Sequence, residues 1–153
     1  MRVIFISLGT NIEPREERLA RARHLLKTAE PCGWQESKIY ETKPWGELNQ
    51  TKFLNQVVEF CSKKTSQELL KLCKGIEQKL GRQKREKWKE REIDLDLLYC
   101  GDEILESENL TVPHPYISQR EFVLHPLRDI APNFRDPKSK LTIEEMLTKF
   151  NIG

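Results

Sequence analysis

Two aspartates separated by one residue are the feature of this sequence that most directly suggests chemistry. Asp94 and Asp96 lie in the run Ile93-Asp94-Leu95-Asp96-Leu97. Side chains alternate along a β-strand, so the two carboxylates would share one face, about 6.6–7 Å apart along the chain. At an effective dielectric constant near 20, two charges about 6.5 Å apart repel by roughly 2.5 kcal/mol. A divalent cation would offset this repulsion, and such carboxylates are the hard oxygen ligands that Mg²⁺ prefers. Two acids can also hold two metal ions, as in phosphoryl transfer. The alternative is a half-exposed strand with a polar outer face.

The densest positive charge in the chain lies immediately before these acids. Six of the ten residues from Arg82 to Arg91 are basic, and only two glutamates oppose them. Arginines in this segment could bind phosphate oxygens through paired hydrogen bonds, and Trp88 could stack on a base or another flat ring. Acids suited to a metal beside a cationic segment form the two halves of a nucleoside-triphosphate site. The alternative is a solvated loop with one docking aromatic residue. The sequence contains no GxxxxGK[ST] or GxGxxG motif, so side chains and metal ions would have to hold the triphosphate.

Two other segments contain residues suited to ligand binding. His114 lies between two prolines, which restrict the backbone and set its direction. It could donate a hydrogen bond to a phosphate, although a turn histidine with no role is the simpler interpretation. The segment 40–55 is rich in aromatic and amide side chains. A flat heterocycle could stack there and pair with the Asn55 amide, which donates and accepts. The alternative is a turn followed by a strand, with Phe53 in the core.

The composition predicts one soluble globular domain over residues 1–153, because 37% of the residues are hydrophobic and 33% are charged. A formal net charge of +2 is too small to imply a nucleic-acid or membrane partner. The four cysteines form neither a CxxC pair nor a Cys/His cluster, which predicts reduced, mostly buried thiols. The apolar run at residues 3–6 is too short to span a membrane, and no signal-peptide pattern follows it, so we expect a cytoplasmic protein.

The spacing of apolar residues predicts the order β-α-β-β-α-β, followed by a less regular tail. The predicted elements are a strand at 3–6 stopped by Gly9, a helix at 15–29, strands at 34–42 and 53–61, a helix from a Thr65/Glu68 capping box to Gly81, a strand at 93–100, and a short terminal helix after a Thr142/Glu145 capping box. This order is typical of a ferredoxin-like α+β fold, with helices on one face of an antiparallel sheet and a C-terminal extension. The other face would be free for loops and a ligand. Arg120 and Phe122 would share one face of an extended segment but not of a helix.

Taken together, the motifs resemble those of the 6-hydroxymethyl-7,8-dihydropterin pyrophosphokinase family from Ser7 to Pro132. The matching segments are Ser7-Leu8-Gly9-Thr10-Asn11, Tyr40-x-Thr42-x-Pro44-x-Gly46, Phe53-x-Asn55, Gly81-Arg82, Trp88-x-x-Arg91-x-Ile93-Asp94-Leu95-Asp96, Val112-Pro113-His114-Pro115 and Arg120-x-Phe122-Val123-Leu124-x-Pro126-Leu127. Several ordered motifs in one short chain are more specific than any one of them. One departure is Trp88-Lys89-Glu90-Arg91, where the family usually has Trp-Gly-Pro-Arg.

The resemblance implies a magnesium- and ATP-dependent enzyme of folate biosynthesis. The hydroxyl of the dihydropterin would attack the β-phosphorus of ATP, and AMP would leave. The implied catalytic residues are Arg82, Arg91, Asp94 and Asp96, and the two aspartates would bind two Mg²⁺ ions. The implied ATP-binding residues are Glu77, Lys84, Trp88, Arg91, Leu97, Thr111, His114 and Arg120. The implied pterin-binding residues are Thr42, Trp45, Phe53, Asn55, Trp88 and Phe122. We expect ATP and a dihydropterin as the partners of a monomer that binds neither nucleic acid nor membrane.

Two other functions are compatible with the residues. A ferredoxin-like domain could use its basic segment and aromatic side chains to bind single-stranded RNA. That function would tolerate loss of Asp94 and Asp96 and would not depend on magnesium. A catalytically weak homologue, impaired at Lys89-Glu90, would bind ATP and pterin but release little AMP.

Overall fold

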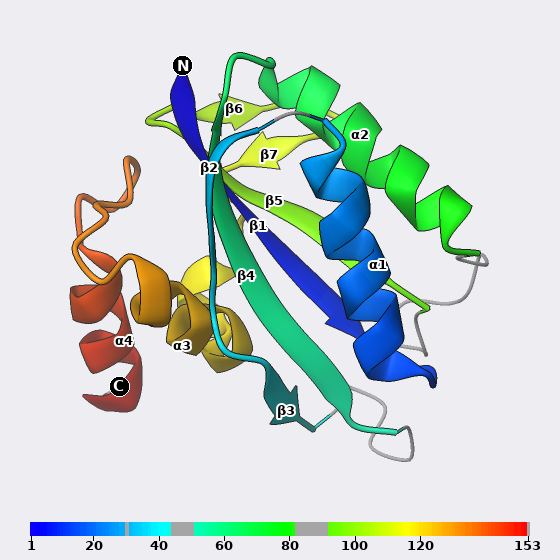
Figure 1. Ribbon diagram of the computed structural model, residues 1–153. Coiled ribbons are helices and arrows are strands. Elements are labelled where there is room, and N and C mark those ends of the chain that lie inside the picture. The colour runs from blue at the N-terminus through cyan, green and yellow to red at the C-terminus, as the bar shows by residue number, and fades with distance from the viewer. Residues whose placement is uncertain (30, 44–50, 82–91, 153) are drawn as a thin grey trace.

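A five-stranded antiparallel sheet forms the centre of the computed structural model, which describes residues 1–29, 31–43, 51–81 and 92–152. The strand order is β2-β4-β1-β5, and β3 also pairs with β4. The strands are β1 (Arg2–Thr10), β2 (Cys32–Glu36), β3 (Tyr40–Thr42), β4 (Phe53–Ser62) and β5 (Asp94–Cys100). Helix α1 (Arg15–Lys27) connects β1 to β2, and α2 (Ser66–Lys79) connects β4 to β5 (Figure 1). If β2 and β3 count as one interrupted strand, this is the predicted β-α-β-β-α-β order, and the ferredoxin-like α+β fold is confirmed.

The first core lies between the sheet and the helices α1 and α2. Alternate residues of β1 (Ile4, Ile6 and Leu8) are at most 1% exposed and pack against fully buried residues of both helices, including Leu19 and Leu69. Helix α2 begins at the predicted capping box: the Thr65 hydroxyl accepts from the Glu68 N–H at 3.1 Å, and the Glu68 carboxylate accepts from the Thr65 N–H at 2.9 Å.

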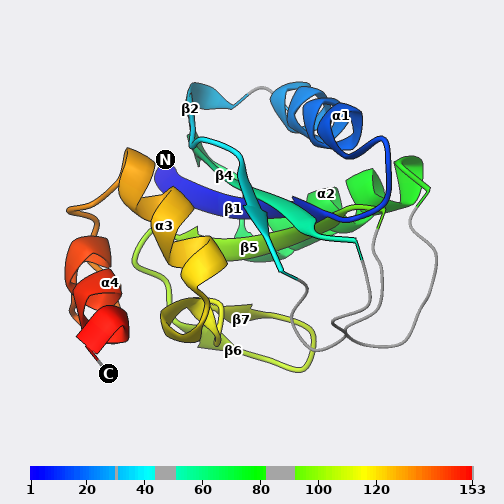
Figure 2. The same ribbon diagram turned by 90° about the horizontal axis from the view of Figure 1, so that it is seen from below.

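The second core covers part of the opposite face of the sheet, which Figure 2 shows below the strands. It packs Phe5, Val57 and Tyr99 against the C-terminal part of the chain. That part comprises a short 3-10 helix (Ile117–Gln119), α3 (Glu121–Ile130) and α4 (Ile143–Ile152). The two short strands β6 (Leu105–Glu106) and β7 (Thr111–Val112) pair with each other, and Leu105 and Val112 pack with the first core instead. The tail is therefore more regular than the sequence indicated, and the face expected to be free for loops and a ligand is partly covered by two helices.

The main differences from the predicted boundaries lie in β1, in the strand expected at 34–42 and in α1. β1 does not stop at Gly9, which pairs with both β4 and β5, but continues to Thr10, which pairs with Leu54 of β4. The expected strand at 34–42 is divided into β2 and β3. Between β2 and β3, the Val57 N–H donates to the Ser37 hydroxyl oxygen at 3.0 Å instead of to a main-chain carbonyl, so the regular pairing with β4 is interrupted. The helix predicted at 15–29 ends at Lys27.

The four cysteines are free, as expected, but they are less buried than expected. Cys73 and Cys100 are buried, Cys61 is half-buried and Cys32 is exposed.

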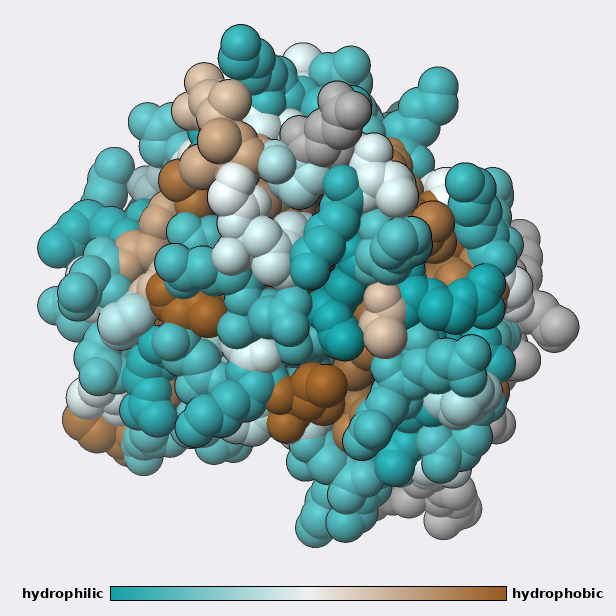
Figure 3. Space-filling view, in the orientation of Figure 1, coloured by the Kyte–Doolittle hydropathy of each residue, from teal (hydrophilic) through white to brown (hydrophobic). Residues whose placement is uncertain are grey.

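The surface seen from the direction of Figure 1 is largely hydrophilic, with hydrophobic side chains in small separate groups (Figure 3). Over the described parts of the chain, every helix is too short or too polar to cross a membrane.

Candidate active site

A row of residues crosses the sheet on the face that carries α3. The row runs through Asp94 of β5, Gly9 of β1, Asn55 of β4 and Tyr40 of β3. Directly paired residues of antiparallel strands point to the same face, so Asp94 and Asn55 face the same side, two strands or about 10 Å apart. Asp96 belongs to the next row on that face, beside Ser7. Between the acids and the amide, β1 thus contributes only a glycine and a serine.

Gly9 allows the Asn55 amide to approach β1 closely. A Cβ atom at Gly9 would lie 3.1 Å from Oδ1 of Asn55 and 3.8 Å from Cδ1 of Phe53. The first distance is tighter than an ordinary van der Waals contact. The sequence pattern predicts a strand end at Gly9 and does not reveal this role, although a glycine inside a strand often marks such a close approach.

β5 separates core residues from candidate ligands by alternation. Leu95 and Leu97 are 4% and 5% exposed and belong to the core beneath α1 and α2. Asp94 and Asp96 are half-buried. The structure therefore confirms that the two carboxylates share a face.

A cavity of about 350 Å³ lies along the outer edge of β5, between α2 and the segment that follows β7. It brings together six of the predicted metal- and ATP-binding residues: Glu77, Asp94, Asp96, Leu97, Thr111 and His114. Its volume is within the range of small-molecule sites. Lys74, Glu108 and Asn109 also line it, and none of the three is among the ATP contacts predicted from the sequence.

Glu77 connects α2 to the strand that carries both acids. Its side chain is buried, at 4% exposure, and Oε2 accepts from the Leu95 N–H at 2.8 Å. Because β5 is an edge strand, this N–H points away from β1, and the carboxylate takes the place of a further strand. Glu77 thereby anchors the peptide between the two aspartates.

His114 enters the cavity in its neutral form. Burial, and after it the positive charge of Arg120, lowers the pKa of the imidazole to about 4, although Asp94 opposes the shift. Nδ1 accepts from the Tyr116 N–H at 3.3 Å, which assigns the ring proton to Nε2. The His114 main chain is held by a 3.0 Å hydrogen bond from its N–H to the Leu98 carbonyl. At neutral pH the side chain can therefore donate one hydrogen bond without carrying a charge.

Arg120 and Phe122 lie together at the start of α3. Arg120 has extended backbone angles (φ −122°, ψ 100°) and precedes the helix, whereas Phe122 is in its first turn. The guanidinium carbon is 5.6 Å from the centroid of the Phe122 ring. Burial lowers the pKa of Arg120, while the carboxylates of Asp96 and Asp94 favour its charged form. The spacing of the two residues predicts a shared face only in an extended segment, but the turn from extended chain into helix also brings the side chains together.

The predicted pterin-binding residues on β3 and β4 are in direct contact. Asn55 is 7% exposed, and its Nδ2 donates to the Thr42 hydroxyl at 2.5 Å. Phe53 pairs with Thr42 across the two strands and is half-buried. The remaining predicted site residues, Arg82, Lys84, Trp88, Arg91 and Trp45, lie outside the described residues.

The acid pair is suited to Mg²⁺ that also binds a substrate. In the part of the chain that the structure describes, no group of three or more His, Cys, Asp or Glu side chains is arranged to hold a metal ion. Among the described residues, an ion at Asp94 and Asp96 would have no third His, Cys, Asp or Glu ligand, which leaves positions for water or phosphate oxygens. Mg²⁺ is commonly bound in this way, through one or two carboxylates together with substrate phosphates.

Comparisons with known proteins identify the family to which this chain is similar. The family model described as 7,8-dihydro-6-hydroxymethylpterin-pyrophosphokinase (HPPK) matches residues 5–132. The 2-amino-4-hydroxy-6-hydroxymethyldihydropteridine pyrophosphokinase of Aquifex aeolicus is 36% identical, covering 98% of this chain and 96% of the relative. The protein of the same name from Bacillus subtilis is 43% identical, covering 84% of this chain and 78% of the relative.

Solved structures of larger proteins share the fold. A structure described as HPPK-DHPS in complex with substrates has a TM-score of 0.74 at 14% identity. Plasmodium falciparum HPPK-DHPS with pteroate has a TM-score of 0.76 at 15% identity. The present chain spans only 43% and 42% of those two chains, respectively. The family model covers most of the sequence, and two relatives exceed 30% identity over most of their lengths. The chain therefore belongs to the 7,8-dihydro-6-hydroxymethylpterin-pyrophosphokinase family.

Proposed function

We propose that this protein transfers pyrophosphate from ATP to the hydroxymethyl group of 6-hydroxymethyl-7,8-dihydropterin and releases AMP, in folate biosynthesis. Family membership is the observation that carries the proposal. The pterin hydroxyl oxygen bonds to the β-phosphorus and loses its proton. The bond between that phosphorus and the oxygen bridging it to the α-phosphate breaks, and this oxygen leaves with AMP. Residues 1–153 act as one pyrophosphokinase domain.

In this proposal Asp94 and Asp96 bind two Mg²⁺ ions, and the adjacent cavity takes ATP. The shared face of the two carboxylates and the cavity of about 350 Å³ beside them support this assignment. Bound Mg²⁺ would neutralise phosphate charge and polarise the reacting phosphorus–oxygen bonds. Glu77 keeps the two carboxylates in position through the intervening peptide. Leu97 and Thr111, which also line the cavity, contact the nucleotide.

His114 and Arg120 bind the phosphates in different ways. Neutral His114 donates one hydrogen bond from Nε2, whereas Arg120 supplies positive charge and several donors. The two side chains are close enough that the charge of Arg120 depresses the pKa of His114. Keeping His114 neutral avoids a second buried positive charge, and Arg120 is then the charged partner of the triphosphate.

The dihydropterin binds on the same sheet face, between the acids and β3. The Asn55 amide forms hydrogen bonds with the polar edge of the ring, and its contact with Thr42 orients the amide. Phe53 and Phe122 contact the flat faces of the ring. Because Gly9 has no side chain, a substrate can lie over the β1 backbone and extend from Asn55 toward Asp94 and Asp96. Transfer of this kind depends chiefly on positioning and charge neutralisation.

The other assigned residues complete the proposal by resemblance to the family. Arg82, Lys84 and Arg91 bind the phosphates, with Arg82 and Arg91 acting in catalysis. Trp88 contacts ATP and pterin, and Trp45 contacts the pterin. The RNA-binding alternative finds no support in the family to which the chain belongs. The catalytically weak alternative depends on Lys89-Glu90, which lies outside the described residues.

The test is AMP release from ATP, measured with and without 6-hydroxymethyl-7,8-dihydropterin over a range of Mg²⁺ concentrations. AMP formation that requires both pterin and Mg²⁺ is the expected result. Binding of both substrates without AMP formation would instead identify a catalytically weak homologue. Absence of ATP and pterin binding would contradict the proposed function.

A further inference from the structure

The connection from β1 to α1 contacts the chain on both sides of the candidate site. Thr10 and Asn11 lie at the end of β1 and are 0% and 1% exposed. The register with β5 ends at the pair Gly9–Asp94, and the register with β4 ends at Thr10–Leu54. Beyond these pairs the strands are no longer joined by main-chain pairing. Hydrogen bonds from the side chains of Thr10 and Asn11 connect the segments there instead.

Thr10 holds the chain just before the acid pair. Its hydroxyl donates to the Glu92 carbonyl at 2.6 Å, and Glu92 is itself 5% exposed. Glu92 precedes Asp94 by two residues, so this contact constrains the chain where it enters β5. The hydroxyl oxygen also lies 3.5 Å from the Ile12 nitrogen, at the limit of a hydrogen bond.

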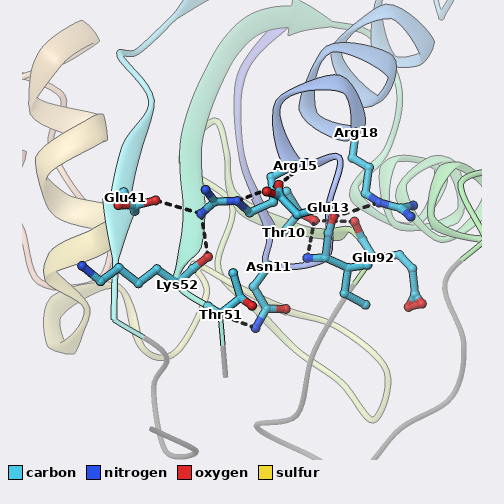
Figure 4. Close-up of polar contacts among 10 residues, drawn as sticks. Thr10, Asn11, Glu13, Arg15, Arg18, Glu41, Thr51, Lys52 and Glu92 are labelled. Carbon is cyan, nitrogen blue, oxygen red and sulfur yellow. Dashed lines mark hydrogen bonds and ion pairs between the residues drawn. The ribbon is translucent and has the colours of Figure 1, made fainter. Parts of the chain in front are cut away.

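Asn11 holds the chain just before the predicted pterin-binding residues. Its Nδ2 donates to the Thr51 carbonyl at 3.0 Å, and Thr51 precedes Phe53 by two residues. Two adjacent side chains on one turn thus reach the entry to β5 and the entry to β4 (Figure 4). These two entries are more than 40 residues apart in sequence.

Arginines from α1 support the same turn. Arg15 donates to the Lys52 carbonyl and to the Glu41 carboxylate, both at 2.9 Å, and so ties β3 and β4 to the start of the helix. Arg18 donates to the Ile12 carbonyl at 3.0 Å and to the Leu80 carbonyl, near the end of α2, at 3.3 Å. Figure 4 shows Thr10 and Asn11 reaching from the turn toward Glu92 and Thr51, and Arg15 reaching from α1 toward Glu41 and Lys52.

We propose that Thr10 and Asn11 are positioning residues that hold the acid pair and the Phe53–Asn55 segment in a fixed relation to each other. This inference rests on the proposed function, because that reaction requires the pterin hydroxyl and the metal-bound phosphates to meet. Thr10 acts on the side of Asp94, and Asn11 acts on the side of Asn55. A displacement of about 1 Å in such a site can reduce the rate on the order of 10²-fold.

The proposal is tested by whether substitutions at Thr10 and Asn11 affect different steps, since Thr10 acts on the acid pair and Asn11 acts on the pterin-binding segment. Thr10→Val keeps the shape of the side chain but removes its hydroxyl, and Thr10→Ser keeps the hydroxyl. We expect Thr10→Val to lower kcat on the order of 10²-fold and to raise the Mg²⁺ concentration needed for half-maximal rate. Pterin binding, measured without ATP by fluorescence, should stay at the wild-type level. Thr10→Ser should restore most of kcat.

Asn11→Ala should give the opposite pattern. We expect weaker pterin binding, with Kd raised about tenfold, equivalent to about 1.4 kcal/mol. The Mg²⁺ concentration for half-maximal rate should not change. Thr28→Val is the matched control, because Thr28 makes the same type of bond, from its hydroxyl to the Leu25 carbonyl at 2.6 Å, at the end of α1. Its kinetic constants should equal those of the wild type.

Three outcomes would overturn the proposal. Wild-type kinetics in a folded Thr10→Val variant would show that the Glu92 contact does not position the acids. Equal losses of Mg²⁺ response and pterin binding in both variants would indicate a general effect on folding. If Thr10→Val does not fold, Thr10→Cys replaces it in the test, because a thiol is a weaker hydrogen-bond donor than a hydroxyl. Wild-type kcat and a wild-type Mg²⁺ requirement in Thr10→Cys would then overturn the proposal. Absence of AMP formation by the wild-type protein would instead contradict the proposed function.

Discussion

The two faces of β5 differ in what their side chains do, although they alternate along a single strand. Leu95 and Leu97 are buried in the core beneath α1 and α2. Asp94 and Asp96 lie on the other face and line the cavity at the outer edge of the strand. The core face is covered by helices along the strand, whereas the opposite face has its own apolar core only toward Tyr99. One strand can therefore present ligands rigidly because its reverse side is held by packing.

This comparison predicts that substitutions on the two faces affect different quantities. The largest effect should follow Asp96→Ala, which removes a proposed metal ligand. Metal ions at phosphoryl groups stabilise the transition state by several kcal/mol, so AMP formation should fall by roughly 10³-fold or more. The unfolding free energy should change little, because the variant leaves both apolar cores intact. Steady-state AMP release and urea denaturation measure the two effects. Retained turnover would contradict the assignment of Asp96 to metal binding.

A substitution on the covered face should give the reverse result. Leu8→Ala removes a side chain that is 1% exposed beside Leu95 in the paired strand. Large-to-small changes in a core of this kind cost about 2–5 kcal/mol. We therefore expect a lower urea midpoint, with kcat near the wild-type value at temperatures where the variant is folded. A large loss of kcat in the fully folded variant would show that the two faces are not separable.

The features that sequence reasoning recovered are those encoded by local spacing. The alternation of acids and leucines in β5 needs only the period of a strand. The capping box of Thr65 and Glu68 needs only three residues of separation, and the structure confirms both of its hydrogen bonds. Strong local signals of this kind set the order of the elements, and that order was sufficient to predict the ferredoxin-like topology.

The features that sequence reasoning missed depend on contacts between distant segments. Helix α3 contains Pro126, which usually interrupts a helix, yet its apolar side buries against the second core. The bond from Glu77 to the Leu95 N–H exists because α2 lies beside an edge strand. The bond from Thr10 to the Glu92 carbonyl joins residues 82 positions apart. No local pattern marks either of these hydrogen bonds.

Glu77 acts on the acid pair through the backbone, because its carboxylate accepts from the Leu95 N–H between the two aspartates. Glu77→Gln preserves a side-chain oxygen that can accept from the Leu95 N–H, whereas Glu77→Leu removes the acceptor and leaves a buried donor without it. We expect Glu77→Leu to lose about 1–3 kcal/mol of unfolding free energy and also to reduce kcat. Glu77→Gln should retain most of both. If Glu77→Gln lost activity as fully as Glu77→Leu, the negative charge would matter more than the hydrogen bond.

Gly9 tests the pterin side of the same face. Gly9→Ala would place a Cβ atom 3.1 Å from Oδ1 of Asn55, so the amide must move by a few tenths of an ångström. We expect about a tenfold weaker pterin affinity, equivalent to about 1.4 kcal/mol, with ATP affinity unchanged. Ser7→Ala, at the next position on this face, adds no atoms and is the control. Equal pterin affinity in Gly9→Ala and the wild type would show that the Asn55 position is not critical.

The smallest effect should be a pH dependence of stability that originates at His114. The folded pKa is about 4, below the ordinary value of 6.5, chiefly because burial disfavours the charged ring. Between these two values the unfolded chain binds a proton at His114 that the folded protein does not, so the contribution of His114 to the unfolding free energy falls as the pH falls from about 6.5 to about 4. His114→Gln should flatten this dependence, and the half-buried position of the ring keeps the difference modest. Urea denaturation of the two proteins in EDTA, without ATP, at several pH values measures it. Parallel curves would mean that other groups, rather than the cavity histidine, account for acid sensitivity, and would weaken the case that His114 binds phosphate as a neutral donor.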